Sequence, residues 1–392
     1  ATNQVWTSRS LVTYAMTNNV ELKAIRSARG VADAAIVSSR AIPNPTVKLE
    51  WLHANAATSE MGWGVGLAWE PPHPVERSAR KGQAEAIRRG VDEEIAEAEN
   101  ELAASIHNAC VAADELDEQR KVVEKSIELR ERILKSLQER LTQGAATRIE
   151  VNMASLSLVR AHQERDTIVL RRQTVLRGLT ALAGLPAGQT IGLEPTQQQD
   201  DVGPVPEVAG LEQRAMRQSP QLRADAARAE AAEQQLRAER TRQYPWISFS
   251  ALPRYRHNYS SSNVNDLSFG IDISFPIFDS NRGGIAEAEA ERGKQATARA
   301  AHEAHIRRDV ALALAEMQGR RELLVRFKST MEPVFREHQT MMQMVLANHQ
   351  VDIVALLTAE DSIVRSQIEL SELRQAYRNA QIQLNRALGN RR

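Results

Sequence analysis

The histidines are the first candidates for metal chemistry, but their spacing is poor. His302 and His305 lie three residues apart in a helix-favouring segment, as metal ligands can, yet the sequence places no third ligand nearby. The tetrapeptide His-Glu-Ala-His at 302–305 also lacks one spacer residue of the zinc-protease motif His-Glu-x-x-His. We interpret these two histidines as part of a solvated helix face, and His349 as a polar turn residue. The sequence therefore predicts no metal site and no cofactor.

Carboxylates near two predicted helix turns are stronger candidates for a function. Glu150 and Asp352 each follow a short break between long helical segments. A carboxylate that symmetry repeats around a pore forms a ring that attracts cations and repels anions. An acidic residue at a helix start can instead be only a cap or a partner of the helix dipole. For Asp352 both interpretations stay open, whereas for Glu150 we favour the pore.

The other reactive side chains give no sign of catalysis. Cys110 is the single cysteine, which excludes an internal disulfide, and its small apolar neighbours indicate a buried packing residue. We find no serine–histidine–aspartate arrangement, phosphate-binding loop or dinucleotide motif. We predict that the protein is not an enzyme.

Composition excludes two further classes. The 392 residues include 50 Lys and Arg against 50 Asp and Glu, so there is no basic excess to neutralise the phosphates of a nucleic acid. No stretch approaches 18 consecutive apolar residues, which excludes a transmembrane helix. A membrane role remains open, because the strands of membrane barrels are short and alternating.

Very long helices must carry most of the chain. The intervals 75–185, 277–332 and 334–392 contain no proline and are rich in Ala, Glu, Gln, Arg and Leu, which favour helix. A helix from Val75 to Gln143 would be about 100 Å long. Helices of this length must pack against one another as a coiled coil or a bundle.

The chain also contains an internal repeat. Residues match at an offset of 200 between positions 11 and 45, and at an offset of 205 between positions 71 and 184. We predict two structural copies, 1–185 and 208–392, joined by a linker at 186–207. Each copy should hold a helix of about 35 residues, a strand pair and a long helical hairpin. The strand pairs are expected at about 45–70 and 245–276, and the hairpin tips near 144 and 349.

The predicted strands resemble those of a membrane barrel. In all four, every second residue is apolar, and eleven of the sixteen aromatic residues lie in the windows 43–73 and 244–279. Alternation over about nine residues, with aromatics near the strand ends, is typical of strands that cross a bilayer. A small soluble sheet with one buried face is the alternative, but it does not explain long helices on both flanks in duplicate.

Four strands cannot close such a barrel, since the smallest known barrels have about eight strands. An open sheet would leave unsatisfied backbone edges in lipid. Several chains must therefore share one barrel, as a dimer of eight strands or a trimer of twelve. The polar strand residues would line a water-filled lumen; they are Lys48, Glu50, Ser248, Ser250 and Asp272.

With these features the chain resembles the TolC-type outer-membrane efflux channels of Gram-negative bacteria. The resemblance covers nearly the whole chain and rests on the duplication and on the turn segments 144–154 and 349–359. Each turn segment is followed thirty residues later by a glycine, Gly184 or Gly389. The compact length looks most like the heavy-metal (cobalt–zinc–cadmium) branch.

The resemblance implies a mainly α fold with a small β part. In it, a homotrimer joins a twelve-stranded barrel in outer-membrane lipid to a long periplasmic α-helical barrel of coiled coils. It implies a passive exit duct, for heavy-metal cations in this branch, whose partners are a periplasmic adaptor and an inner-membrane pump of the RND type. Carried over to this sequence, the tip positions that contact the adaptor are Gly144, Thr147, Glu150, Ala154, His349, Val354, Leu357 and Ala359.

This chain departs from the family pattern at the second turn. His349 stands where the family usually has glycine, and Ala355 stands where family members often place an acid. Any acidic constriction must then use other residues, with Arg140 and Arg148 near enough in sequence to pair with them. The candidate gate consists of Arg148, Glu150, Asp352, Glu360 and Asp361. The chain starts at Ala1 rather than at the lipidated cysteine of many relatives, so we expect no lipid anchor.

Three other functions stay open. A duct of the same family could export drugs or proteins. A periplasmic coiled-coil adaptor would also carry a helical hairpin, although adaptors have one hairpin and this chain has two. A soluble coiled-coil scaffold would leave Trp51, Trp63 and Trp69 exposed unless a sheet core buried them.

Overall fold

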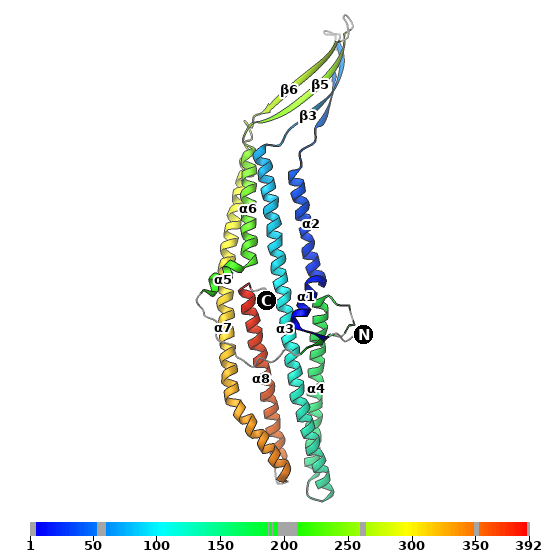
Figure 1. The fold of residues 1–392 in the computed structure, drawn as a ribbon, viewed down its shortest axis with the longest axis vertical. Helices are drawn as coiled ribbons and strands as arrows, with labels where there is room; N and C mark the ends of the chain where they lie inside the picture. Colours follow the sequence, from blue (N-terminus) through cyan, green and yellow to red (C-terminus); the bar gives the residue numbers. More distant parts are fainter. Residues whose placement is uncertain are drawn as a thin grey trace. The chain divides into compact units, whose positions relative to one another are not determined.

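The computed structural model describes residues 5–52, 60–186, 188–189, 191–194, 210–258, 264–348 and 353–389. Most of these residues are helical, with a small sheet part, as predicted (Figure 1). They divide into two compact units. The helical unit comprises Ala1–Ile25, Ala96–Ser219 and Ala304–Arg392, and the sheet unit comprises Arg26–Ile95 and Pro220–Glu303. The units do not coincide with the two sequence halves, because each unit takes segments from both.

Four long helices dominate the fold. They are α3 (Pro74–Thr142), α4 (Arg148–Ala183), α7 (Arg282–Asn348) and α8 (Ile353–Ala387). Within the helical unit, α3 runs beside α4 and α7 beside α8, so each pair forms a hairpin (Figure 1). The predicted helix from Val75 to Gln143 corresponds to α3, whose 69 residues begin at a proline. Proline is favoured at this first position, where its missing N–H would have no helical partner.

The helix expected before each strand pair is broken into two. In the first half, α1 (Ser8–Asn18) and α2 (Val20–Arg40) are separated by Asn19, whose side-chain oxygen accepts a 2.7 Å hydrogen bond from the backbone N–H of Leu22. An asparagine that caps a helix start in this way competes with continuation of the preceding helix. In the second half, α5 (Leu211–Gln218) and α6 (Pro220–Thr241) are separated at Ser219.

Both breaks contact a glycine at the end of a hairpin. Gly184 and Gly389 follow α4 and α8 with φ angles of +71° and +70°. A Cβ on Gly184 would lie 2.5 Å from the carbonyl oxygen of Asn18, and a Cβ on Gly389 would lie 3.0 Å from that of Gln218. Only glycine combines the left-handed backbone with so close an approach. The same contact is thus made twice along the chain.

The sheet unit contains one antiparallel sheet of four strands in the order β2-β3-β5-β6. The strands are β2 (Thr46–Leu52), β3 (Glu60–Trp69), β5 (Trp246–Asn258) and β6 (Val264–Ser274). The register aligns Trp51 with Trp63, and Trp63 with Tyr255. Because side chains alternate across a strand, this register gathers the apolar positions on one face and the polar ones on the other.

A second, smaller sheet was not expected. In the helical unit, β1 (Val5–Trp6) pairs in parallel with β4 (Gly192–Leu193). The strand β4 lies within the segment 186–207 that we predicted as a linker, so this segment contains a strand that the prediction did not include. Two residues are too few to show an alternating pattern.

The core of the helical unit is divided into separate clusters along the helices. One cluster joins α7, α8 and α5 and includes Val310, Met317 and Leu384. Another joins α1, α3 and α4 and includes Leu11, Ile106 and Leu179. Cys110 is buried in the second cluster, as predicted. Its burial raises the pKa of the thiol to about 11, so it stays protonated at neutral pH.

Candidate functional site

The turn of the first hairpin is held by a capping box. The backbone N–H and the hydroxyl of Thr147 donate to the Glu150 carboxylate at 2.6 and 2.8 Å, and the Glu150 N–H donates to the Thr147 hydroxyl at 3.3 Å. The bond from the Thr147 backbone lowers the pKa of Glu150, so this acid carries its charge at neutral pH. Gly144 has a φ of +75°, which lets the chain leave α3 and turn back.

The two arginines near this turn are not bound to its acid. The Arg140 guanidinium donates to the Ala145 carbonyl oxygen at 3.3 Å and contributes only at longer range to the low pKa of Glu150. Arg148 is exposed, and no ion pair joins it to another of the described residues. The acid at this turn is therefore positioned by Thr147 rather than by an arginine.

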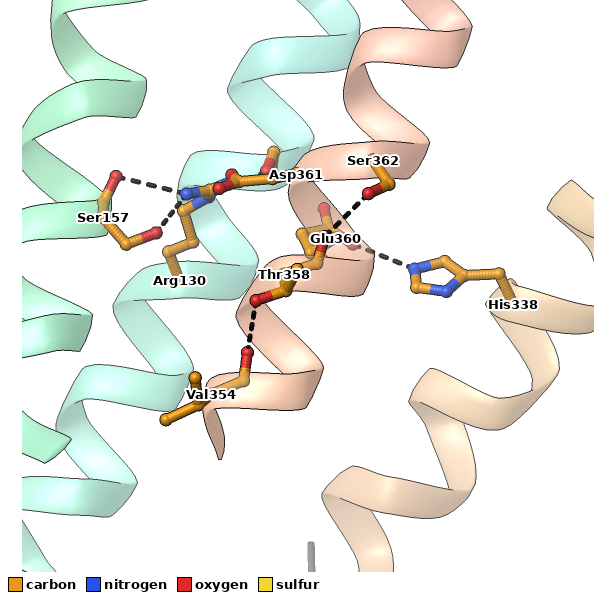
Figure 2. Close-up of polar contacts among 9 residues, drawn as sticks. Arg130, Ser157, His338, Val354, Thr358, Glu360, Asp361 and Ser362 are labelled. Carbon is orange, nitrogen blue, oxygen red and sulfur yellow. Dashed lines mark hydrogen bonds and ion pairs between the residues drawn. The ribbon is translucent and has the colours of Figure 1, made fainter. Parts of the chain in front are cut away.

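Asp361, one of the predicted gate residues, binds a buried arginine of the other hairpin (Figure 2). Arg130 of α3 is 4% exposed and donates to Ser126 on its own helix at 3.1 Å. It also donates to the Ser157 carbonyl oxygen on α4 at 3.2 Å and to the hydroxyl of the same serine. Its remaining nitrogen pairs with Asp361 on α8. One guanidinium thus connects three helices, and its planar set of donors suits such a role.

Glu360, the neighbour of Asp361, contacts a different helix. Its carboxylate is buried and lies 3.0 Å from Nε2 of His338 on α7 (Figure 2). Consecutive helical residues point about 100° apart, which allows two adjacent acids to contact two different helices. Together, Glu360 and Asp361 connect α8 to α7 on one side and to α3 on the other.

Two of the predicted tip residues lie inside the helical unit instead of on its surface. Ala154 and Leu357 are 1% and 6% exposed and belong to one cluster with Ile133 and Leu137. A buried side chain cannot touch a partner, so for these two residues we replace the predicted contact with a packing role between the hairpins. Of the remaining predicted tip positions, Gly144, Thr147, Val354 and Ala359 are exposed and Glu150 is half-buried. The tip residue His349 and the gate residue Asp352 lie outside the described residues.

A second buried charge joins the hairpins farther from the turn. Glu115 of α3 is 2% exposed and accepts hydrogen bonds from the Ser371 hydroxyl at 2.8 Å and from Arg378 at 3.1 Å, both on α8. Burial raises the pKa of Glu115, and the hydrogen bond from Ser371 acts in the opposite direction. Sequence reasoning missed Glu115 and Arg130, because a charged residue that becomes buried looks like any other charged residue in helices this rich in charge.

The histidine prediction needs one correction. His305 is exposed, but His302 is half-buried in the sheet unit, with Nδ1 2.6 Å from the carboxylate of Asp225. Asp225 is 2% exposed and also accepts from Arg228 at 3.1 Å. A buried carboxylate needs such partners, and no sequence spacing predicts a pair 77 residues apart. Across the described ranges, no group of three or more His, Cys, Asp or Glu side chains could hold a metal ion.

The sheet presents a broad apolar face to its surroundings. Leu49, Trp51 and Phe269 are 76%, 74% and 77% exposed. The other exposed apolar residues on this face are Val47, Trp63, Val65, Leu67, Trp69, Ile247, Phe249, Leu267, Ile271 and Ile273. Such an area on four adjacent strands exceeds what isolated surface residues produce and marks a surface that something apolar covers. None of the described helices is both long and apolar enough to span a bilayer.

Comparison with known proteins agrees with these features. The sequence profile described as "Outer membrane efflux protein" matches residues 11–185 and 211–390. The cobalt-zinc-cadmium resistance protein CzcC of Cupriavidus metallidurans is 23% identical over 333 residues, which span 83% of this chain and 76% of that protein.

Solved structures agree in fold. The structure of CusC aligns with a TM-score of 0.79 at 18% identity and covers 97% of this chain and 92% of that one. The outer membrane protein VceC of Vibrio cholerae aligns with a TM-score of 0.73 at 18% identity and covers 97% and 96%. The resemblance to TolC-type channels inferred from the sequence is thereby confirmed, and this chain belongs to the outer membrane efflux protein family.

Proposed function

We propose that the protein is the outer-membrane exit duct of a tripartite efflux system and conducts its substrate passively. One observation carries the proposal, namely an antiparallel sheet with one apolar, exposed face and one polar face. In lipid, the apolar face would contact acyl chains and the polar face would line water. The duct has no catalytic role in this proposal, and the energy comes from the inner-membrane partner.

The duct is a homotrimer with twelve strands. A sheet of four strands ends in two edges, β2 and β6, whose outer backbone groups need partners within a membrane. With an even number of antiparallel strands, β6 of one protomer can pair antiparallel with β2 of the next. Three copies then close the ring, while the long helices continue into the periplasm as an α-helical barrel.

The chain arose from a duplication, with copies at 1–185 and 208–392. The two segments matched by the family profile, 11–185 and 211–390, support this division. The paired contacts of Gly184 and Gly389 with the two helix breaks support it as well.

The hairpin tips form the contact with a periplasmic adaptor, which connects the duct to an RND-type pump. The contact residues that this proposal retains are Gly144, Thr147, Glu150, His349, Val354 and Ala359. The gate consists of Arg148, Glu150, Asp352, Glu360 and Asp361. The bonds of Glu360 and Asp361 to the neighbouring helices support a role in holding α8 in place.

Heavy-metal cations are the substrate class that we favour. Similarity to a cobalt-zinc-cadmium resistance protein supports this choice, and a duct for drugs or proteins is the second candidate. Two measurements separate the proposals. Reconstitution into a planar bilayer should give discrete conductance steps, and their absence would contradict the duct. In a host that lacks its own outer-membrane channel, expression with a matching pump and adaptor should raise tolerance to cobalt, zinc or cadmium; raised tolerance to drugs alone would favour the second candidate.

A further inference from the structure

One row across the polar face of the sheet concentrates charge. The register aligns Glu50 on β2 with Gly64 on β3, Gly64 with Arg254 on β5, and Arg254 with Asp266 on β6. Arg256 lies on the same face, two residues farther along β5. In the proposed barrel this face lines the lumen, so these charges would face the conducted ions.

Arg254 reaches across an entire strand to its partner. Its Nε and Nη2 lie 3.0 and 2.9 Å from the same carboxylate oxygen of Glu50, although β3 runs between their two strands. Glycine on β3 makes this possible, because a Cβ on Gly64 would lie 3.1 Å from Cγ of Arg254. The arginine stem therefore occupies the space that a side chain at position 64 would fill.

Arg256 pairs with a carboxylate on β6, on the other side of β5 from the partner of Arg254. Its guanidinium lies 2.7 Å from the carboxylate of Asp266 on β6. The Arg256 stem passes close to another glycine, since a Cβ on Gly62 would lie 3.1 Å from its Cγ. Each of the two arginines is thus paired with one carboxylate on another strand, and the charges of these four residues sum to zero.

These pairs are open to solvent. The side chains of Arg254 and Glu50 are 41% and 49% exposed, and those of Arg256 and Asp266 are 40% and 34% exposed. A pocket of about 410 Å³ lies at this level and is lined by Glu50, Gly64 and both arginines, among others. The charges are therefore accessible to ions in solution, and their field extends over a screening length of about 10 Å at 0.1 M salt.

We infer that the pairs Glu50–Arg254 and Asp266–Arg256 set the ion selectivity of the duct at the level of the sheet. The inference rests on the proposed function, since it requires the polar face to line a pore. A threefold assembly repeats each charge around the lumen, and such rings determine which sign of ion passes. With both pairs intact the ring is balanced and discriminates little. Loss of a carboxylate leaves the positive charge of its arginine uncompensated. Loss of an arginine leaves the negative charge of its carboxylate uncompensated.

The test measures the reversal potential of the purified full-length protein in a planar bilayer under a potassium chloride gradient. Glu50→Gln should raise the chloride-to-potassium permeability ratio at least about twofold, and Asp266→Asn should shift it in the same direction. Arg254→Gln should shift the ratio the other way. The double variant Glu50→Gln/Arg254→Gln removes both charges and should restore the value of the unaltered protein. Ser268→Ala alters the same face without a charge and should change nothing.

The outcomes separate this inference from the proposed function. If the unaltered protein forms no conducting channels, the duct and the selectivity ring are both wrong. If the channels conduct but Glu50→Gln and Arg254→Gln leave the reversal potential unchanged, the duct stands and the ring is wrong. Shifts of the same sign in these two variants would also contradict the ring, because a purely structural effect has no reason to follow the sign of the removed charge.

Discussion

At the scale of single residues, Arg130 holds several helices together, since its buried guanidinium donates hydrogen bonds to Ser126, Ser157 and Asp361. We expect Arg130→Met to lower the unfolding free energy of the protein in detergent by about 1–3 kcal/mol, because the bonds to these three residues are lost together. The control is Arg326→Met. Arg326 pairs with Glu322 on one helix at 70% and 71% exposure, so its loss should cost less than about 0.5 kcal/mol. If both variants lose the same unfolding free energy, the buried hydrogen bonds of Arg130 stabilise the protein no more than an exposed ion pair does.

Glu150 allows a separation between capping and gating. Glutamine at this position keeps the hydrogen bond to Thr147 but removes the charge, whereas alanine removes both. If the charge closes the tip, Glu150→Ala and Glu150→Gln should both raise the resting single-channel conductance. If only the cap matters, the alanine variant alone should do so. Unchanged current in both variants would exclude Glu150 from the gate.

The same carboxylate makes the first turn of α4 sensitive to acid. The pKa of Glu150 in the folded protein lies below its ordinary value of 4.5, because the Thr147 backbone N–H binds the ionised form. Its contribution is complete above pH 4.5 and is lost as the pH falls through the lowered pKa. Hydrogen exchange of the backbone amides at residues 147–151, corrected for intrinsic rates, should accelerate once the pH falls below the lowered pKa of Glu150. Glu150→Gln should remove this pH dependence; an unaltered dependence would assign it to another group.

At the scale of elements, the glycines that end the hairpins should tolerate no side chain. Gly184→Ala forces a left-handed residue against the Asn18 carbonyl, at a distance of 2.5 Å from the new Cβ. We expect the free energy of unfolding to fall by about 1–3 kcal/mol, which is measured as a lower midpoint of thermal unfolding. Gly178 lies inside α4, and apart from the backbone of its own helix and its chain neighbours no atom lies within 4 Å of an added Cβ, so Gly178→Ala should be neutral or stabilising. Similar midpoints for the two variants would contradict the packing described here.

Elements were predictable where their signal is local and long. The proline-free stretch that starts at position 75 predicts α3, and the alternation of residues predicts the four strands of the larger sheet, because both patterns repeat over many residues. Helix-favouring residues predict α7 as well, although this helix runs through one proline, Pro333. The break at Asn19 was not predicted, since one capping side chain decides it. The pair β1 and β4 is too short to have a period. Contacts of Arg130, Glu115 and His302 depend on helices meeting in three dimensions, which a single sequence does not encode in its spacing.

At the scale of the whole molecule, the apolar face of the sheet is the main evidence for a place in a membrane. Its tryptophans and phenylalanines are exposed in a single chain, so either lipid or another protein must cover them. Membrane insertion in turn requires closure, because the edges β2 and β6 are incomplete in one protomer. The proposed function and the trimer follow from this face, and the selectivity ring follows from the polar face on the other side of the same sheet.

The most direct test is the mass of the membrane-extracted protein in detergent, determined by light scattering with a correction for bound detergent. We expect a protein mass near three times 43.6 kDa and no fraction that dissolves in water alone. A monomer or dimer that stays in solution without detergent would contradict the duct and favour a coiled-coil scaffold.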